Sequence, residues 1–221
     1  MIAAVVPFKG GADAKSRLSS AMSVRERQRL SFQLLHHVLS VLSRAEEIDR
    51  VAVVGRIPIP NTAFVADPGG GLNPAVARGI RWSIGLGADA IVVLPADLPF
   101  ITRSDIAALI NLMPSGSGGV VAPSKDGGTG ALLLRPPMLV DPCFGPHSGQ
   151  RHMTAIRDAG GTISVLQRSG LAIDIDVPAD LDLLGDELLD VAWSRNGSGP
   201  HIGIDATNKT GEHSAGADFD A

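Results

Sequence analysis

Asp97 is the first residue that could do chemistry, because it stands between two prolines at the end of an apolar run, residues 91–94. An uninterrupted β-branched run of this kind predicts a strand that is buried on both faces. Pro95 and Pro99 cannot extend a sheet ladder, so the strand should stop at Asp97. In open α/β sheets, ligands bind at the edge where the strands end. Asp97 is therefore a candidate ligand-binding carboxylate, and an aspartate that caps a turn is the alternative.

Two further carboxylates lie in residues 171–177, where acidic and apolar residues alternate. This alternation predicts a strand with Asp174 and Asp176 on one face. Neighbouring carboxylates repel each other, and a divalent cation is the simplest compensation, with a solvated strand face as the alternative. Because the acids come without cysteine or paired histidine partners, these hard oxygen donors favour Mg²⁺.

A cationic loop, residues 9–18, follows the first predicted strand and contains Lys15 and Arg17. Alignment with the phosphate-binding motif G-x-x-x-x-G-K-[ST] fails, since Lys9 and Ala14 occupy the two glycine positions. What remains is a glycine-containing turn with cations that could hold a triphosphate. A solvated basic loop is the alternative.

Two glycine-rich turns offer backbone amides to an anion. The first, residues 68–74, contains Gly71 and Asn73 ahead of a predicted helix at residues 75–83. The alternative is a helix start that needs no ligand, in which Asn73 is the N-cap and Pro74 the first helical residue. The second turn, residues 144–149, contains Gly145 and Ser148, and it could equally be a plain helix entry.

The elements that must position these residues alternate along the chain. Strands are expected at residues 2–8, 51–54, 63–66, 91–94, 119–123, 131–134, 163–166 and 171–177, and helices at residues 24–44, 75–83, 102–112, 150–159 and 178–191. Ser23 with Glu26 and Thr102 with Asp105 mark two helix starts. This order predicts a three-layer α/β domain around a mostly parallel sheet.

Composition narrows the function further. The 221 residues suffice for one domain, expected at residues 1–191, and the Gly/Ser/Asn/Asp-rich residues 192–221 are expected to form a disordered tail. A net charge of −4 argues against binding nucleic acid. Single Cys143 favours a reducing compartment, and no apolar run is long enough for a membrane span or a signal peptide. We therefore expect a cytoplasmic protein without a membrane partner.

Carboxylates beside an anion cradle predict a magnesium-dependent phosphoryl or nucleotidyl transfer. No nucleophile–base pair stands out in the sequence. None is required if the attacking group is already ionised, as a phosphate attacking the α-phosphorus of a nucleotide would be.

Six ordered segments carry a resemblance to a known family: residues 15–18, 71–73, 94–99, 126–129, 144–148 and 171–176. Over about residues 2–185 the chain resembles the 2-phospho-L-lactate guanylyltransferases of coenzyme F420 biosynthesis. That family also includes phosphoenolpyruvate and 3-phospho-D-glycerate guanylyltransferases. The resemblance implies a nucleotidyltransferase fold of the nucleotide-diphospho-sugar transferase type, related to molybdenum-cofactor guanylyltransferases. It also implies that GTP and a phosphorylated three-carbon acid react to release diphosphate.

The same resemblance assigns roles to individual residues. Metal ligands would be Asp97, Asp174 and Asp176; the acid would be bound near Thr129, Gly145 and Ser148; the nucleotide would be bound near Lys15, Arg17, Gly71 and Asn73, with Lys15, Arg17 and Asp97 catalytic. The unstable product would be handed to the next enzyme of the pathway. The family often has Asn where this chain has Gly130, so the acid-binding loop is expected to differ. Another small-molecule nucleotidyltransferase and a non-catalytic nucleotide-binding regulator remain the alternative functions.

Overall fold

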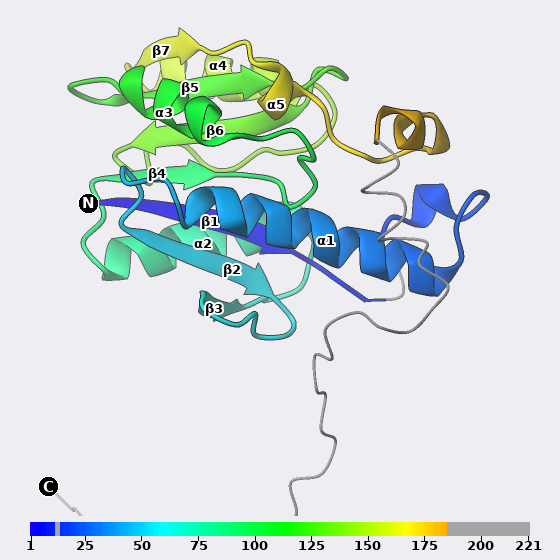
Figure 1. Ribbon diagram of the computed structural model, residues 1–221. Helices are drawn as coiled ribbons and strands as arrows, with labels where there is room; N and C mark the ends of the chain where they lie inside the picture. Colours follow the sequence, from blue (N-terminus) through cyan, green and yellow to red (C-terminus); the bar gives the residue numbers. More distant parts are fainter. Residues whose placement is uncertain (12–13, 185–221) are drawn as a thin grey trace, which may run out of the picture.

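A seven-stranded sheet forms the centre of the computed structural model, which describes residues 1–11 and 14–184 (Figure 1). Its strands lie in the order β3-β2-β1-β4-β6-β5-β7. They are β1 (Ile2–Phe8), β2 (Arg50–Gly55), β3 (Ala63–Ala66), β4 (Ala90–Val93), β5 (Gly118–Pro123), β6 (Thr129–Arg135) and β7 (Thr162–Val165). Only β6 among these strands runs antiparallel to its neighbours β4 and β5, so the prediction of a mostly parallel sheet is confirmed.

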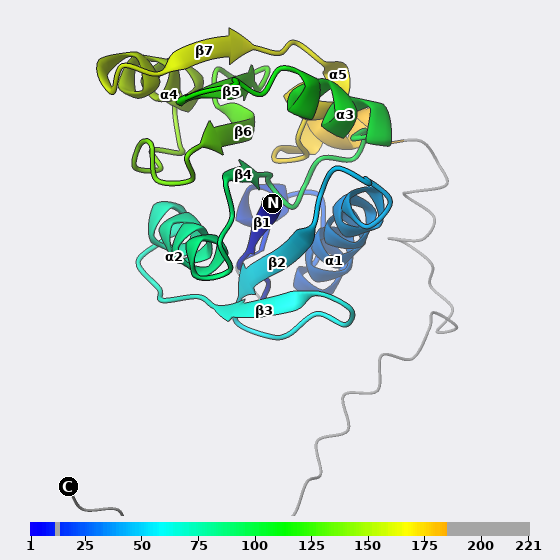
Figure 2. The ribbon, with the colours of Figure 1, turned by 90° about the vertical axis from the view of Figure 1, so that its left-hand side faces the viewer.

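Helices cover both faces of the sheet and complete the three layers (Figure 2). One face carries α2 and α4, and the other carries α1, α3 and α5. The helices are α1 (Val24–Leu42), α2 (Leu72–Gly85), α3 (Arg103–Asn111), α4 (Ser148–Asp158) and α5 (Ser169–Ala172), with 3-10 turns η1 (Ser16–Leu18) and η2 (Pro178–Leu183). None of the helices in the described ranges is long and apolar enough to cross a membrane.

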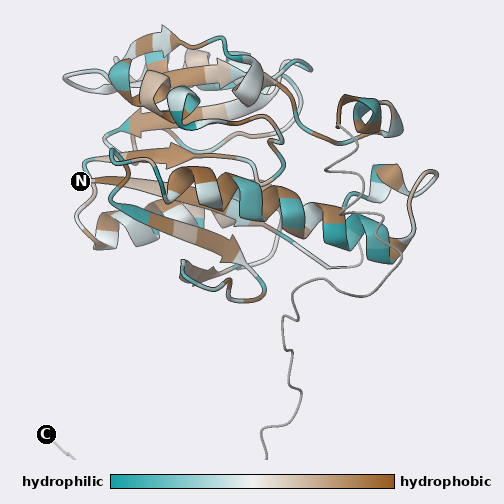
Figure 3. Cartoon of the chain, in the orientation of Figure 1, coloured by the Kyte–Doolittle hydropathy of each residue, from teal (hydrophilic) through white to brown (hydrophobic). Residues whose placement is uncertain are grey.

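The central strands are apolar because both of their faces are covered (Figure 3). Every residue of β4 is buried, and each face of the sheet packs on its own core. On one face Val92 of β4 packs with Val38 of α1 and Ile106 of α3, and on the other Val93 packs with Val76 of α2. The strand that ends before Asp97 is thus a rigid part of the core.

Both predicted helix starts are confirmed. Ser23 Oγ accepts from the amide of Glu26 at 3.4 Å, and the Glu26 carboxylate accepts from the Ser23 amide at 2.8 Å. At α3, the Asp105 carboxylate accepts from the Thr102 amide at 2.9 Å. These reciprocal bonds satisfy amides that the first turn of a helix leaves unpaired.

The strand predicted at residues 171–177 is wrong. The segment begins inside α5 and then continues as extended chain outside the sheet. Its amides have other acceptors, because the carboxylate of Asp180 binds the amides of Asp176 and Val177 at 2.9 and 2.8 Å. Its apolar residue Ile175 packs into a separate cluster with Leu18 and other residues of α1 and η2. The polar–apolar alternation therefore reflects burial against helices instead of sheet pairing.

Two details at helix ends also differ from expectation. Helix α2 begins at Leu72 with Gly71 as its N-cap, so the interpretation of Asn73 as an N-cap is wrong. Beyond Val177 the described chain forms only the 3-10 turn η2, and residues 185–191 of the predicted last helix lie outside the described residues. The predicted tail at residues 192–221 also lies outside them.

Candidate active site

A cavity of about 270 Å³ opens at the carboxyl ends of β1 and β4, the edge of the sheet at which the sequence predicted ligand binding. Its lining includes Phe8, Lys15, Pro95, Asp97, Phe144 and Asp176. Most of these residues are far apart in the sequence, whereas Pro95 and Asp97 share the loop after β4. The position follows from the fold, since parallel strands that end together leave a crevice beyond their carboxyl ends.

A second cavity of about 300 Å³ lies beside the first. It is lined by the glycine turn (Gly69, Gly70 and Gly71) together with Arg56 and Asp67, and it shares Pro7, Phe8, Lys9 and Leu72 with the first cavity. Gly71 has a φ of 110°, which L side chains rarely adopt, so the turn requires glycine at this position. The two cavities adjoin each other through the residues that they share, and Lys9 is a cation that lines both.

Lys15 and Asp97 meet in the first cavity as an ion pair. The Lys15 side chain is only 8% exposed, whereas that of Asp97 is 27% exposed. Lys15 has a left-handed backbone, with φ 51° and ψ 43°, just before η1. This sparsely populated conformation for a residue with a side chain is typical of functional sites.

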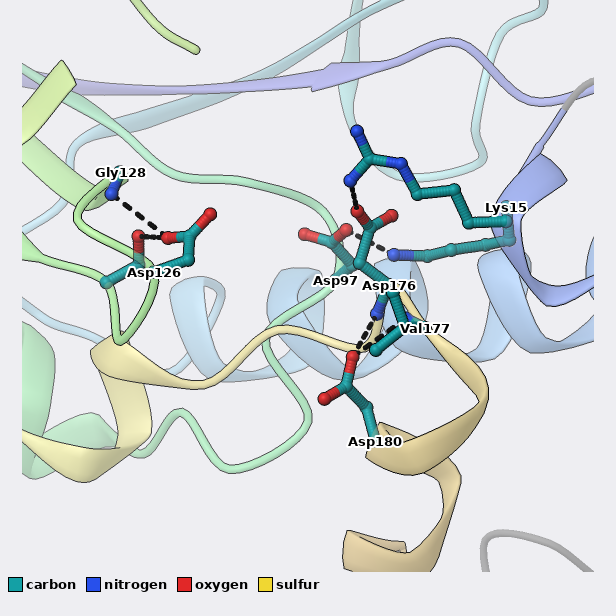
Figure 4. A network of polar contacts seen from close by, with 9 residues as sticks. Lys15, Asp97, Asp126, Gly128, Asp176, Val177 and Asp180 are labelled. Atoms are coloured by element: carbon teal, nitrogen blue, oxygen red, sulfur yellow. Dashed lines mark hydrogen bonds and ion pairs between the residues drawn. The ribbon is translucent and has the colours of Figure 1, made fainter. Parts of the chain in front are cut away.

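Arg17 and Asp176 form a second, more exposed ion pair. In Figure 4 the side chains of Lys15, Asp97 and Asp176 lie close together, and Asp180 lies below Asp176. Asp180 holds the backbone of Asp176 through the two amide bonds described above. Asp126 lies to one side, with its carboxylate accepting from the amide of Gly128 at 3.0 Å.

Asp174 is half-buried near this group. Burial, together with the neighbouring charge of Asp97, raises its pKa to about 6, against the opposing effect of Lys15. The charged form of Asp174 is therefore disfavoured mainly by burial, which the Lys15 cation offsets only in part. Within residues 1–11 and 14–184, however, no three acidic, histidine or cysteine side chains are gathered closely enough to hold a metal ion.

Thr129 and Ser148 meet in a buried network, 2.9 Å apart through their hydroxyl oxygens. Thr129 Oγ1 also lies 3.0 Å from Nδ1 of His152, and Nε2 of His152 accepts from the amide of Cys143 at 3.1 Å. Because Nε2 accepts, Nδ1 carries the proton and donates to Thr129. Burial, together with the charge of Arg151, lowers the pKa of His152 to about 4, so the imidazole is neutral.

Gly145 lies in the exposed loop between Phe144 and α4, with a φ of 125°. Asn73 of α2 binds the backbone of Phe144. Neither of the two cavities includes Thr129, Gly145 or Ser148 in its lining, and Phe144 is the loop residue that reaches the first one.

The structure thus gathers the predicted residues into two groups. Lys15, Asp97 and Asp176 line the first cavity, with Arg17 paired to Asp176 and Asp174 within reach of the charge of Asp97. Thr129 and Ser148 form a separate group with His152, whose ring packs on Phe144. Sequence reasoning missed His152 and Asp180 as residues that support the site. His152 follows Ser148 at helical i, i+4 spacing, which was an available signal. Asp180 stands at the third position of a helix start with Pro178, which predicts its bond to the Val177 amide, whereas its bond to the Asp176 amide depends on the path of residues 173–177.

Comparison with known proteins shows the family to which the chain is related. Residues 2–188 match the family described as "Guanylyl transferase CofC like". The chain is 39% identical over 189 residues to a phosphoenolpyruvate guanylyltransferase of Sphaerobacter thermophilus, covering 82% of this chain and 91% of the relative. It is 30% identical to a 3-phospho-D-glycerate guanylyltransferase of Phenylobacterium zucineum, covering 81% and 88%.

Solved structures share the fold. A protein of Desulfovibrio desulfuricans G20, described as a nucleotide-diphospho-sugar transferase, superposes with a TM-score of 0.70 at 16% identity, covering 89% of this chain and 91% of that one. A nucleotidyl transferase of Methanothermobacter thermautotroptrophicus superposes with a TM-score of 0.63 at 18% identity, covering 86% and 98%. At these identities the likeness confirms the predicted fold class alone.

Proposed function

The chain belongs to the CofC-like guanylyl transferase family, and we propose that it transfers GMP from GTP to a phosphorylated three-carbon acid. The reaction releases diphosphate and is a step of coenzyme F420 biosynthesis. Phosphoenolpyruvate is the first acceptor to test, because the relatives at 39% and 38% identity are named for it. 2-Phospho-L-lactate and 3-phospho-D-glycerate are the acceptors named for more distant relatives.

The observation that carries the proposal is the Lys15–Asp97 pair in a cavity continuous with the glycine turn. A phosphate oxygen of the acid would attack the α-phosphorus of GTP. The new phosphorus–oxygen bond forms as the bond to the β-phosphate breaks, and diphosphate leaves with the bond electrons. The attacking phosphate is already ionised, so no general base is needed, and catalysis consists of positioning and charge neutralisation.

Lys15 and Arg17 are the cations proposed to face the phosphates. Lys15 is the better placed, because its side chain is nearly buried in the cavity and an ammonium group there neutralises charge more effectively than in water. The Arg17 side chain is 72% exposed, so it can exchange Asp176 for a phosphate oxygen as its partner. The amides of the glycine turn would donate hydrogen bonds to the remaining anionic oxygens of the nucleotide.

We further propose that Asp97, Asp174 and Asp176 hold Mg²⁺, which supplies charge neutralisation on the phosphates when bound. In the described part of the chain these three carboxylates are not gathered closely enough to hold a metal ion by themselves, so the substrate phosphates would complete the site. The donor chemistry supports this, since all three are carboxylates, the oxygen ligands that Mg²⁺ prefers. Two of the three carboxylates are paired with Lys15 and Arg17, and these two cations would be free to face the phosphates where the carboxylates hold the ion instead. Calorimetric titration with MgCl₂ of the native protein and of Asp97→Asn tests the assignment directly; equal affinities would contradict it.

The deciding experiment is diphosphate release from GTP with each of the three acids, run separately, with ATP as the nucleotide control. Release with GTP and one acid establishes the reaction and names the acceptor. If folded protein that binds GTP releases no diphosphate with any of the three acids, a different acceptor or a non-catalytic nucleotide-binding regulator would be favoured. A cytoplasmic location and direct transfer of the product to the following enzyme stay predictions.

A further inference from the structure

Asn73 uses both ends of its side-chain amide on one residue of the facing loop. Its Oδ1 accepts from the amide of Phe144 at 2.7 Å, and its Nδ2 donates to the carbonyl of Phe144 at 3.1 Å. The two residues are 71 positions apart in the sequence. This paired geometry resembles one rung of a β-ladder. It fixes Phe144 against the first turn of α2, one residue beyond Leu72, which lines both cavities.

His152 holds the same loop from the opposite side. It is fully buried, and its Nε2 accepts from the amide of Cys143, the residue before Phe144. Its Nδ1–H bonds Thr129, and its ring packs edge-to-face on the ring of Phe144, with centroids 4.8 Å apart. A neutral ring with one donor and one acceptor is what these contacts require.

We propose that Asn73 and His152 are positioning residues that together set the loop Cys143–His147 for binding of the phosphorylated acid. The inference rests on the proposed function, because the acid is expected at Thr129, Gly145 and Ser148. Asn73 ties this loop to the helix that begins at the glycine turn, and His152 ties it to Thr129 and α4. The side-chain amide of Asn73 thus fixes the position of the acid-binding loop relative to the glycine turn, where the nucleotide is proposed to bind.

This role differs from direct nucleotide binding, which the family resemblance suggested for Asn73. Both polar atoms of the side chain already have backbone partners on Phe144, which fixes the orientation of the amide. A nucleotide could reach only the second N–H of Nδ2 or the second lone pair of Oδ1. If Asn73 positions the loop, its replacement raises the KM for the acid and leaves the KM for GTP native. If Asn73 binds the nucleotide, its replacement raises the KM for GTP and leaves the KM for the acid native. The distinction can therefore be measured.

The primary test is steady-state kinetics of Asn73→Ala, with GTP and the acid varied separately. Loosening of the loop should raise the KM for the acid by about ten- to a hundredfold and leave the KM for GTP nearly native, since small misplacements of a binding group have effects of that size. Asn111→Ala is the matched control, because Asn111 is an exposed asparagine at the end of α3. It should behave as the native enzyme.

A second readout does not depend on turnover. Hydrogen exchange in the segment containing Cys143 and Phe144 should be faster in Asn73→Ala than in the native protein, because the Phe144 amide loses its acceptor. His152→Phe keeps an aromatic ring beside Phe144 and removes the acceptor for Cys143, so it should accelerate exchange of the Cys143 amide and raise the acid KM as well. His36→Ala, at an exposed histidine of α1, is its control.

A native acid KM in both Asn73→Ala and His152→Phe would overturn the proposal, whatever the exchange rates. Loss of GTP affinity with a native acid KM in Asn73→Ala would also overturn it and make Asn73 a nucleotide ligand. If the native enzyme uses none of the acids, the proposed function fails on its own. The positioning of the loop is then judged by exchange alone, and unchanged rates would refute it.

Discussion

The ammonium group of Lys15 is paired with the carboxylate of Asp97, although 82 residues separate them along the chain. Lys15 comes from the loop after β1, and Asp97 follows β4, which lies next to β1 in the sheet. The parallel pairing of these strands therefore brings the cation and the acid to one edge. In the proposed reaction each has a different partner, a phosphate for Lys15 and a metal ion for Asp97.

Replacing Lys15 with Met should reduce kcat/KM by about a hundred- to a thousandfold, because a preorganised cation at developing charge contributes on that scale. The substitution also leaves Asp97 without its cation, so the expected destabilisation is measured by chemical denaturation alongside the kinetics. Lys125→Met is the control, since Lys125 is exposed on the β5–β6 turn. Native kinetics in Lys15→Met would remove Lys15 from the catalytic machinery.

Asp174→Asn should stabilise the metal-free protein at pH 8 and have no effect near pH 4. The pKa of Asp174 is about 6 when folded and 3.8 as its ordinary value, so the folded state binds the proton more tightly. The native protein therefore loses stability as pH rises through 6, and the variant does not. After allowance for solvent screening, the difference at pH 8 should be about 1 to 2 kcal/mol.

This difference is measured by urea denaturation in EDTA at pH 4, 6 and 8. Asp158→Asn, at the exposed end of α4, serves as the control and should show no comparable pH-dependent gain. A variant of Asp174 that is less stable than the native protein at pH 8 would contradict the assigned environment of this carboxyl group.

Gly130→Ala should destabilise the fold and abolish most activity. A Cβ atom at Gly130 would lie 1.6 Å from the carbonyl oxygen of Leu171, so α5 and the segment with Asp174 would have to move. Overpacking against backbone typically costs about 1 to 3 kcal/mol. Gly116→Ala is a matched control, because its Cβ would meet no atom within 4 Å. Thermal unfolding and turnover of the two variants separate the effects, and equal behaviour would show that the contact is dispensable.

Ser31→Ala should leave the ligand-free protein as stable as before or stabilise it by up to about 1 kcal/mol. Ser31 lines the first cavity, and its hydroxyl oxygen is buried without a hydrogen-bond partner among the described residues. Ser83→Ala makes the contrast, because the Ser83 hydroxyl donates to the carbonyl of Ile80 at 2.8 Å in a fully buried position. Denaturation should show a loss for Ser83→Ala alone. A similar loss for Ser31→Ala would mean that its hydroxyl is satisfied in solution.

Local signals explain which elements could be predicted. The capping pairs Ser23–Glu26 and Thr102–Asp105 and the apolar run before Pro95 each specify their structure within a few residues. The same alternation signal failed at residues 171–177, because it cannot distinguish a sheet neighbour from helices as the covering layer. Ile175 is buried as the pattern indicates, but its partners lie on α1 and η2.

The alternation of strands and helices, the buried strand before Asp97, and the cations and glycine turns after the strands can all be inferred from the sequence alone, because these features depend on neighbours along the chain. Three contacts become visible only in the fold: Lys15 with Asp97, Asn73 with the backbone of Phe144, and His152 with Thr129 and Cys143. Such contacts are chosen among many possible polar partners by the packing of distant elements. Since burial requires a partner for each of these groups, the fold selects the partners that it brings within reach.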